Sequence, residues 1–435
     1  MALTQRKRRS AEEASPAESP AASPTSSSRA PRGSTFFVAK RLICCGLGSV
    51  YFFAFLAAYF QNRALIGADG LVPCRGRLEA RQREFGDDRL RGFFQSPSVW
   101  WFVEASDDNL ARVAFVGLVA SAAVVAGGHS SLLFAALWLL YFSVVAAGEA
   151  SSTFYSYGWE SQLLETGFLA VFLCSPLDPR SAPTLPVLYL FRWLCFRISV
   201  GAGLIKVRGG SCWARRECLW YHFETQPVPS PLSFVFHFLP RTLLSRGVDV
   251  DLFVQLYTSI LVLVPGFVGP LKVVRRAAGL LQAAFMVAIA ASGNFSILNH
   301  LTIIPALACL DDGVFTSTPR ADKEPPRRRA RPRTVVDAAL LAVVAYLSMP
   351  VVHNLVQTGG GSQVMNASFD PWRLVNTYGA FGSVGERRYE PVVSLSTDGG
   401  RTWAELQWPC KPGDVTRRPC FSAPYHHRLV GRPVS

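Results

Sequence analysis

Apolar stretches recur along the whole chain and constrain its fold more than any other feature. Nine of them occupy residues 42–60, 111–127, 131–148, 162–175, 186–205, 252–270, 278–292, 298–310 and 335–352. Because a helix needs about 20 apolar residues to cross a bilayer, we predict an α-helical polytopic membrane bundle over 41–352, with about five to nine spans. Half of all residues are hydrophobic and only 17% are charged, which excludes an ordinary soluble globule.

Basic residues gather between these stretches and indicate which loops face the cytosol. The net charge of +14 would suit nucleic acid, but the lysines and arginines do not follow one polar face, so we predict no nucleic-acid partner. Such clusters mark loops that stay on the cytosolic side of a membrane. Lys40 and Arg41 precede the first stretch, which starts too late and is too long for a cleaved signal peptide. The amino terminus is therefore predicted to be cytosolic.

Counting nine spans from a cytosolic start assigns every loop to a side. The cytosolic loops are 176–185, 271–277 and 311–334, and the last two carry the densest basic clusters. The lumenal segments are 61–110, 149–161, 206–251 and 353–435. A count of five spans gives the same sides for the two chain ends, because any odd number of spans places the ends on opposite sides of the membrane. The orientation therefore depends on whether the count is odd, and not on the exact number.

Two segments of different composition flank the predicted bundle. Residues 1–40 form a basic, Ser/Pro/Ala-rich stretch that lacks the apolar content needed to fold, which predicts a disordered cytosolic tail. Residues 353–435 are predicted to form a small lumenal β-rich domain. Within it, the alternating run 390–396, the turn 398–400 and the run 402–408 are typical of a hairpin.

Ten cysteines divide into two groups by their surroundings. Five lie in or beside apolar stretches, and the other five lie in polar segments: Cys74, Cys212, Cys218, Cys410 and Cys420. The predicted lumen is oxidising, so the second group can form disulfides. Its odd number leaves one cysteine over, for which Cys74 is the obvious candidate, and the remaining four are disulfide candidates whose pairing the sequence leaves open.

Two Asn-X-Ser sequons are candidates for glycosylation. Asn366 lies about 14 residues beyond the last apolar stretch and is the better candidate. Asn294 lies in a turn that is predicted to be too close to the membrane for modification. Sequons arise often by chance, so each gives only weak support for a lumenal location.

Charged residues within the apolar stretches need partners, because a charge at the centre of a spanning helix is disfavoured by about 2.5–3.5 kcal/mol. Glu160, Glu165, Arg192 and Arg197 are such residues. In the predicted topology Glu165 and Arg197 lie near the lumenal ends of adjacent antiparallel helices, so we predict that they form a structural ion pair. The alternative is a substrate or proton site in an integral-membrane enzyme or transporter.

Recognisable catalytic and metal-binding motifs are absent from the sequence. There is no HExxH, GxSxG, CxxC or phosphate-binding glycine loop, and the histidines are scattered. A nucleophile beside a base is also missing at any recognisable spacing. We therefore predict no catalytic residues, no metal, no cofactor and no enzymatic activity.

Several long motifs resemble the lipase maturation factor family in both content and order. They include the segment FYSYGWESQLLETG, the glycine-rich run before Lys206 and the two carboxyl-terminal motifs around Tyr378 and Tyr425. The resemblance extends from about residue 40 to residue 429. The matching segments are 154–167, 201–206, 212–231, 293–312, 376–383, 410–420 and 424–426.

The resemblance implies a non-enzymatic, chaperone-like protein of the endoplasmic-reticulum membrane, with a cytosolic amino terminus and a lumenal carboxyl terminus. Its implied partners are the lipid bilayer and dimeric secreted lipases, namely lipoprotein lipase, hepatic lipase and endothelial lipase. The client-binding candidates in the lumenal motifs are Asn376, Tyr378, Gly379, Phe381, Tyr425 and His426. Family members continue beyond the motif at 424–426, so the lumenal domain is expected to be shortened here.

Overall fold

The structure is a computed structural model that describes residues 35–149, 154–176, 178–266, 269–315, 331–357, 363–408, 410–414 and 416–428, without the side chains of residues 331 and 332. The predicted disordered tail lies outside the described residues, apart from its last six positions. Most of the arginine cluster at 327–333 also lies outside them. Ser34–Ser435 form one compact unit.

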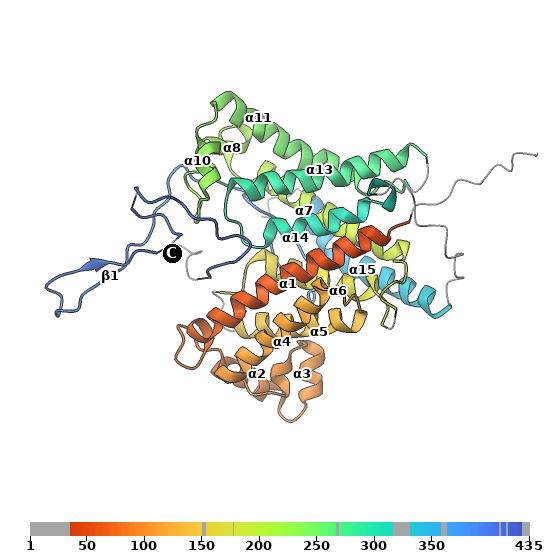
Figure 1. Cartoon of the computed structure of the whole chain (residues 1–435), viewed down its shortest axis with the longest axis horizontal. Helices are drawn as coiled ribbons and strands as arrows, with labels where there is room; N and C mark the ends of the chain where they lie inside the picture. Colours follow the sequence, from red (N-terminus) through yellow and green to blue (C-terminus); the bar gives the residue numbers. More distant parts are fainter. Residues whose placement is uncertain are drawn as a thin grey trace, which may run out of the picture. The chain divides into compact units, whose positions relative to one another are not determined.

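Six helices among the described residues are long and apolar enough to cross a bilayer. They are α1 (Phe37–Ile66), α4 (Asp107–Val125), α5 (Ser131–Glu149), α7 (Leu185–Arg208), α13 (Leu271–Ser292) and α15 (Arg331–Val356). Five of them contain a whole predicted stretch, and α4 contains 111–127 except for its last two residues (Figure 1). The predicted helical membrane bundle is therefore confirmed.

The other three predicted stretches form shorter or broken elements. Residues 162–175 lie largely in α6 (Gly158–Leu173), which is buried among the longer helices. Residues 298–310 form α14 (Leu298–Ala306) and the 3-10 turn η3 (Leu307–Cys309). Both elements are shorter than the candidate spans. Each nevertheless returns the chain to the end of the bundle where α1 begins, because Lys40 donates to the Pro179 carbonyl after α6 and Asp312 after α14 accepts from the Phe37 N–H.

Among its described residues, the stretch 252–270 is helical only at its start. It continues α11 (Arg241–Leu252) through the π-helix η2 (Phe253–Thr258) and ends with α12 (Ser259–Leu261). Beyond that point the buried guanidinium of Arg192 donates hydrogen bonds to the carbonyls of Val262 and Val264. A broken helix inside an apolar region needs such donors for its unpaired carbonyls, which explains the charge at this position.

The remaining elements are short and lie mainly in the segments predicted to be lumenal. They are α2 (Arg75–Phe85), α3 (Arg89–Gln95), η1 (Val99–Trp101), α8 (Ser211–Ala214), α9 (Cys218–His222), α10 (Pro231–His237) and η4 (Asp312–Val314). The strands β1 (Ser394–Leu395) and β2 (Ala404–Glu405) form an antiparallel pair in which Leu395 faces Ala404. The predicted hairpin is confirmed, although its ladder is short.

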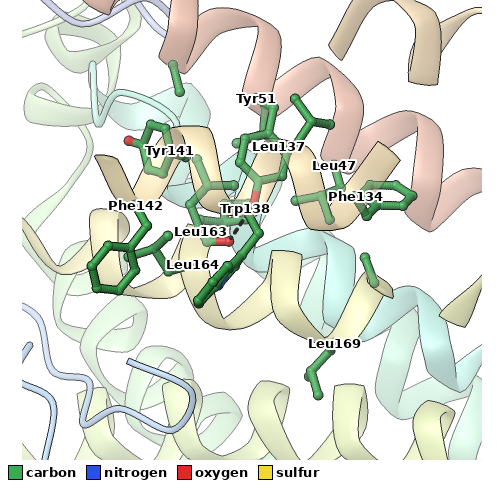
Figure 2. Close-up of a cluster of buried hydrophobic side chains, with 14 of the residues drawn as sticks. Leu47, Tyr51, Phe134, Leu137, Trp138, Tyr141, Phe142, Leu163, Leu164 and Leu169 are labelled. Carbon is green, nitrogen blue, oxygen red and sulfur yellow. Dashed lines mark hydrogen bonds between the residues drawn. The ribbon is translucent and has the colours of Figure 1, made fainter. Parts of the chain in front are cut away.

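The largest hydrophobic cluster joins α1, α5 and α6. Figure 2 shows Tyr51 of α1 between Leu137 and Tyr141 of α5 and Leu163 of α6, and its hydroxyl donates to the Leu163 carbonyl at 3.4 Å. A Cβ at Gly167 would lie 1.9 Å from the Tyr51 hydroxyl. Glycine at this position therefore allows α1 and α6 to approach closely.

Two adjacent aspartates join the starts of α1 and α13. Asp312 accepts hydrogen bonds from the backbone N–H groups of Phe37 and Val38 at 3.0 and 2.7 Å, which caps α1. Asp311 forms ion pairs with Arg275 and Arg276 of α13. The amino-terminal ends of both helices therefore lie at the same end of the bundle.

Candidate functional site

The carboxyl-terminal segment enters the helix bundle and reaches the carboxylate of Glu165. Glu165 of α6 forms an ion pair with Arg197 of α7, and both side chains are buried. One carboxylate oxygen of Glu165 also accepts from the backbone N–H of Asn376 at 3.0 Å and from the Tyr378 hydroxyl at 2.6 Å. Arg197 in turn donates to the Asn376 carbonyl at 2.8 Å. The ion pair and three hydrogen bonds to the carboxyl-terminal segment thus compensate for the burial of two charges.

Close backbone contacts hold this segment against α7. Asn376 is completely buried and Tyr378 is 4% exposed. A Cβ at Gly201 would lie 2.3 Å from the carbonyl oxygen of Tyr378, so glycine is required where the segment crosses α7. The glycine-rich run before Lys206 therefore provides space for the carboxyl-terminal segment.

A second buried ion pair joins α6 to the end of the described chain. Arg428 donates to the carboxylate of Glu160 at 2.7 Å, and both side chains are at most 2% exposed. The guanidinium lies 3.6 Å from the ring centroid of Tyr155 and also donates to the Phe154 carbonyl. Tyr141 donates its hydroxyl to the other oxygen of Glu160. Glu160 and Arg428 thus attach the chain end to the first turn of α6.

The side chain of Asn294 attaches the segment at a third point. Its amide nitrogen donates to the carbonyls of Pro229 and Cys420, and its amide oxygen accepts from the N–H groups of Ser422 and Ala423. An amide with these four partners bridges the loop before α10 and the segment after Cys420. The Asn294 side chain is therefore used inside the fold.

The structure contains both disulfides that the four candidate cysteines can form within their own segments. Cys212 is bonded to Cys218, and Cys410 is bonded to Cys420. Beside the first disulfide, the indole N–H of Trp213 donates to the Phe381 carbonyl at 2.8 Å. Cys74 is buried and is a free thiol. The loop containing Cys212 thus also contacts the carboxyl-terminal segment.

The six client-binding candidates lie against the rest of the protein. Asn376, Tyr378 and Gly379 are buried, and the other three candidates, Phe381, Tyr425 and His426, are half-buried. The Tyr425 hydroxyl accepts from Gln61 of α1 at 2.9 Å. In this conformation the hydrogen-bonding groups of Asn376 and Tyr378 face the bundle and are not available to a client.

The Asn366 sequon lies at the surface beside this segment. Asn366 is exposed, and its amide nitrogen donates to the Gly379 carbonyl at 3.0 Å. A Cβ at Gly158 would lie 2.4 Å from the amide oxygen of Asn366. Asn366 therefore connects the start of α6 with the residues that follow Tyr378.

Two histidines outside the spanning helices are held in the neutral form. Burial lowers the pKa of His222 to about 4, and the charge of Lys206 contributes in the same direction. Burial together with the charges of Arg428 and His427 lowers the pKa of His426 to about 3. The His426 ring packs edge-on against Tyr157 and Trp159 of the FYSYGWESQLLETG motif. Both rings are therefore packed in the neutral form, and protonation of either ring would oppose the observed packing.

Sequence reasoning did not identify Arg428 or Asn294 as anchoring residues. The burial of Glu160 signals that a cation must lie nearby, but many arginines in the chain satisfy that condition equally well. Among the described residues, no group of three or more His, Cys, Asp or Glu side chains is placed to hold a metal ion. The chemistry of the site is that of buried ion pairs and hydrogen bonds.

Comparison with known proteins gives matches over both parts of the chain. Residues 38–317 match the lipase maturation factor transmembrane domain, and residues 374–430 match the lipase maturation factor C-terminal domain. Bovine lipase maturation factor 1 is 42% identical over 92% of this chain and 75% of its own length. The mouse protein of that name is 41% identical, over 96% and 77%.

A second group of relatives is more distant. Human lipase maturation factor 2 is 29% identical over 74% of this chain and 46% of its own length. No solved structure matches the chain. The second matched domain begins within two residues of Asn376 and includes Arg428, so it contains both anchors of the carboxyl-terminal segment.

Proposed function

Because the chain belongs to the lipase maturation factor family, we propose that it promotes the folding and assembly of secreted lipases as a multi-pass membrane protein. The proposed clients are dimeric lipases such as lipoprotein lipase, hepatic lipase and endothelial lipase. Three relatives that match over more than nine-tenths of this chain are named for lipase maturation. The proposed role is non-enzymatic and requires neither a metal nor a cofactor.

The proposed location is the endoplasmic-reticulum membrane, with a cytosolic start and a lumenal carboxyl-terminal segment. The basic residues at the start of α1 and α13 support this orientation, since positive charge accumulates on the cytosolic side. Lys40, Lys272 and Arg276 belong to that end of the bundle. The two disulfides belong to the other proposed side, where an oxidising lumen would maintain them.

The single observation that carries the proposed mechanism is the burial of the carboxyl-terminal segment against Glu165. We assign Glu160, Glu165, Arg197 and Arg428 to anchoring, because each is paired within the bundle. Asn376 and Tyr378 take the same role, in place of client binding. A buried carboxylate with this many partners is poorly suited to bind a substrate or carry protons, which disfavours the enzyme and transporter alternatives.

The hairpin is the part of the segment best suited to contact a client. On one face, Val393 and Leu395 of the first arm lie beside Ala404 and Leu406 of the second, because Leu395 faces Ala404 and the Leu406 N–H donates to the Val393 carbonyl. All four residues are exposed. A two-stranded ribbon with an exposed apolar face gains stability when another surface covers it. An incompletely folded lipase exposes apolar surface that would fit this face.

The proposed function is tested by rescue of secreted lipase activity in cells that lack their own maturation factor. We expect the wild-type chain to restore secreted, active lipoprotein lipase. Replacement of residues 391–407 by a Gly/Ser linker should reduce the rescue while the protein still accumulates, because this ribbon lies outside the core. Hepatic and endothelial lipases, tested in parallel, define the client range.

A substitution elsewhere on the surface is the control. Exchange of residues 86–87, the exposed turn between α2 and α3, for Gly-Ser should preserve rescue. No rescue by a wild-type chain that accumulates normally would contradict the proposed function. Full rescue by the hairpin replacement would contradict the proposed client surface alone.

A further inference from the structure

Helix α10 covers the end of α13 with its polar side. Ser233 donates its hydroxyl to the Ser292 carbonyl at 2.6 Å, and Ser230 donates to the Ala291 carbonyl at 3.4 Å. Gln226 donates to the same Ser292 carbonyl at 3.0 Å. These donors satisfy carbonyls at the last turn of α13 that have no partner within the helix. The contacts fix α10 at the level where a candidate membrane span ends (Figure 1).

The opposite side of α10 is apolar and unusually exposed. Phe234 is 64% exposed, Val235 57% and Phe238 67%. Leu232, Leu239 and Leu243 are also exposed, so we define the α10 apolar face as Leu232, Phe234, Val235, Phe238, Leu239 and Leu243. In water, so many exposed apolar side chains on twelve consecutive positions would be unfavourable.

This face continues into the surface that the candidate spans present to lipid. After Leu243, the exposed side includes Phe253 and Tyr257 of η2, and then Ile260 of α12. On the neighbouring α13, Leu280 and Val287 are likewise exposed. An apolar face at the end of a spanning helix, continuous with its lipid-facing side, lies at the depth of the headgroup boundary.

The ionisable residues within 231–246 are all basic, namely His237, Arg241 and Arg246. Two of them lie beside carboxylates from outside this range: His237 is 3.6 Å from Glu224, and Arg246 is 3.8 Å from Asp249. Arg241 lies 4.9 Å from the ring centroid of Trp220, and the Arg246 side chain is 81% exposed. Arginines beside an apolar face suit the phosphate groups of lipids, which lie just outside the acyl region.

We propose that the α10 apolar face is inserted into the lumenal leaflet of the membrane. Phe234 and Phe238 lie among the upper acyl chains, and Arg241 and Arg246 lie at the level of the phosphates. The lipid occupant follows from the depth of α10 at the end of a candidate span and from its continuity with the lipid-facing side of α13. This insertion holds the loop with the Cys212–Cys218 disulfide close to the membrane surface.

The proposal is tested by spin labelling of the full chain in phosphatidylcholine nanodiscs. A Cys45→Ser parent removes the one described free thiol that is not buried. Labels are then introduced separately by Phe238→Cys, by Val287→Cys as a lipid-facing reference and by Arg401→Cys as an aqueous reference. The measured quantity is the ratio of collision rates with oxygen, which concentrates in lipid, and with a water-soluble nickel chelate.

We expect the ratio at Phe238→Cys to approach that at Val287→Cys and to exceed that at Arg401→Cys clearly. A ratio equal to that at Arg401→Cys would place the face in water and overturn the proposal. Low collision rates with both reagents would show that the face is covered by protein. Dipolar broadening between labels would show that it is covered by a second copy of the chain. Either result would also overturn the proposal. Because Phe238 is exposed, its replacement is compatible with folding, which identical thermal unfolding of the three labelled chains would verify.

Discussion

Individual buried charges on α6 and α7 determine where the carboxyl-terminal segment lies. Glu160 and Glu165 are separated by five residues on one helix and each is paired with a different arginine. Their hydrogen bonds lead to separate parts of the segment, one around Asn376 and one at Arg428. Removal of one partner from such a pair leaves an uncompensated buried charge, which is far more costly than loss of a surface pair.

Neutralisation of Glu165 is expected to destabilise the fold strongly. Glu165→Gln leaves the buried Arg197 without its counter-charge, which costs about 3–5 kcal/mol. We expect loss of accumulation in cells and a lower thermal unfolding midpoint in detergent. The control is Glu84→Gln, which alters an exposed carboxylate and should leave both unchanged.

The charge swap distinguishes the ion pair from the wider network. Glu165→Arg combined with Arg197→Glu restores opposite charges, but it removes the acceptor used by Asn376 and Tyr378. We therefore expect partial recovery of accumulation compared with either single reversal. No recovery at all would contradict a structural ion pair between the two positions.

The Tyr378 hydroxyl is expected to contribute measurably on its own. Tyr378→Phe removes a hydrogen bond to a charged acceptor and should cost about 1.5–3 kcal/mol in the free energy of unfolding. The thermal unfolding midpoint of the purified protein measures the loss. Tyr389→Phe, at a position that is 80% exposed, is the matched control. An unchanged midpoint for Tyr378→Phe would argue against its contact with Glu165.

At the scale of elements, the described residues of the segment 410–428 have few regular backbone hydrogen bonds, and the segment depends on its attachments. A disulfide closes 410–420, Asn294 binds the residues after it, and Arg428 enters the bundle. Such a segment opens locally when one attachment is lost, whereas the helices remain folded. Variants that remove one attachment are therefore expected to reduce the hydrogen-exchange protection of this segment before they affect the global unfolding of the protein.

Loss of Arg428 is expected to release the end of this segment. Arg428→Met keeps much of the side-chain volume but leaves Glu160 buried without its cation. We expect trypsin to cleave after Arg417 several-fold faster than in the wild-type protein, whereas the bond after Arg418 resists trypsin because Pro419 follows it. Arg401→Met controls for the loss of a positive charge in the exposed hairpin. Equal cleavage rates in the wild-type and Arg428→Met proteins would refute the anchoring role.

Acidification is expected to weaken the attachment of the segment 410–428 to the helix bundle. Burial lowers the pKa of His426 to about 3, whereas a histidine in an undocked segment has a pKa near 6.5. Below pH 6.5 the undocked segment therefore binds more protons than the docked segment. The stability of the docked state is fully present above that pH and is lost as the pH falls below it. From pH 7 to pH 5 one such histidine accounts for about 2 kcal/mol.

Hydrogen exchange of residues 416–428 measures this effect. We expect protection to fall between pH 7 and pH 5 after correction for the intrinsic exchange rate. His426→Gln should flatten the pH dependence, although burial of His222, with its pKa of about 4, leaves a residual slope. A wild-type segment with constant protection across this range would contradict the neutral, buried His426.

At the scale of the whole molecule, the carboxyl-terminal segment and the helix bundle share one core. Val375 and Tyr378 belong to the same hydrophobic cluster as α1, α5 and α6. The hairpin, in contrast, lies at the surface with both faces largely exposed. Anchor variants are therefore expected to reduce lipase rescue through loss of the folded protein, and hairpin variants to reduce it at normal protein levels.

Western blotting and rescue, measured on the same cells, separate these two effects. The ratio of secreted lipase activity to maturation-factor abundance should stay near the wild-type value for Tyr378→Phe. The same ratio should fall for replacement of residues 391–407. A lower ratio for Tyr378→Phe would instead indicate that the anchored segment takes part directly in client maturation.

Several features of this protein follow from local sequence alone. Apolar length predicts the six long helices, because a bilayer-spanning helix satisfies its own backbone and needs no knowledge of its neighbours. The hairpin also follows from local alternation and a glycine turn. The family follows from long motifs in preserved order. The pairing of Glu165 with Arg197 is predictable only because two adjacent helices place them at similar depths.

Only the tertiary structure decided how the carboxyl-terminal segment is used. Its motif residues Asn376 and Tyr378 have the polar character expected of an exposed binding surface, yet they lie inside the bundle. Likewise, the stretch 252–270 has the composition of a span, but its helix ends at Leu261, where Arg192 supplies donors from α7. In each case a partner far away in the sequence supplies the compensating charge or hydrogen bond, and local pattern contains no information about that partner.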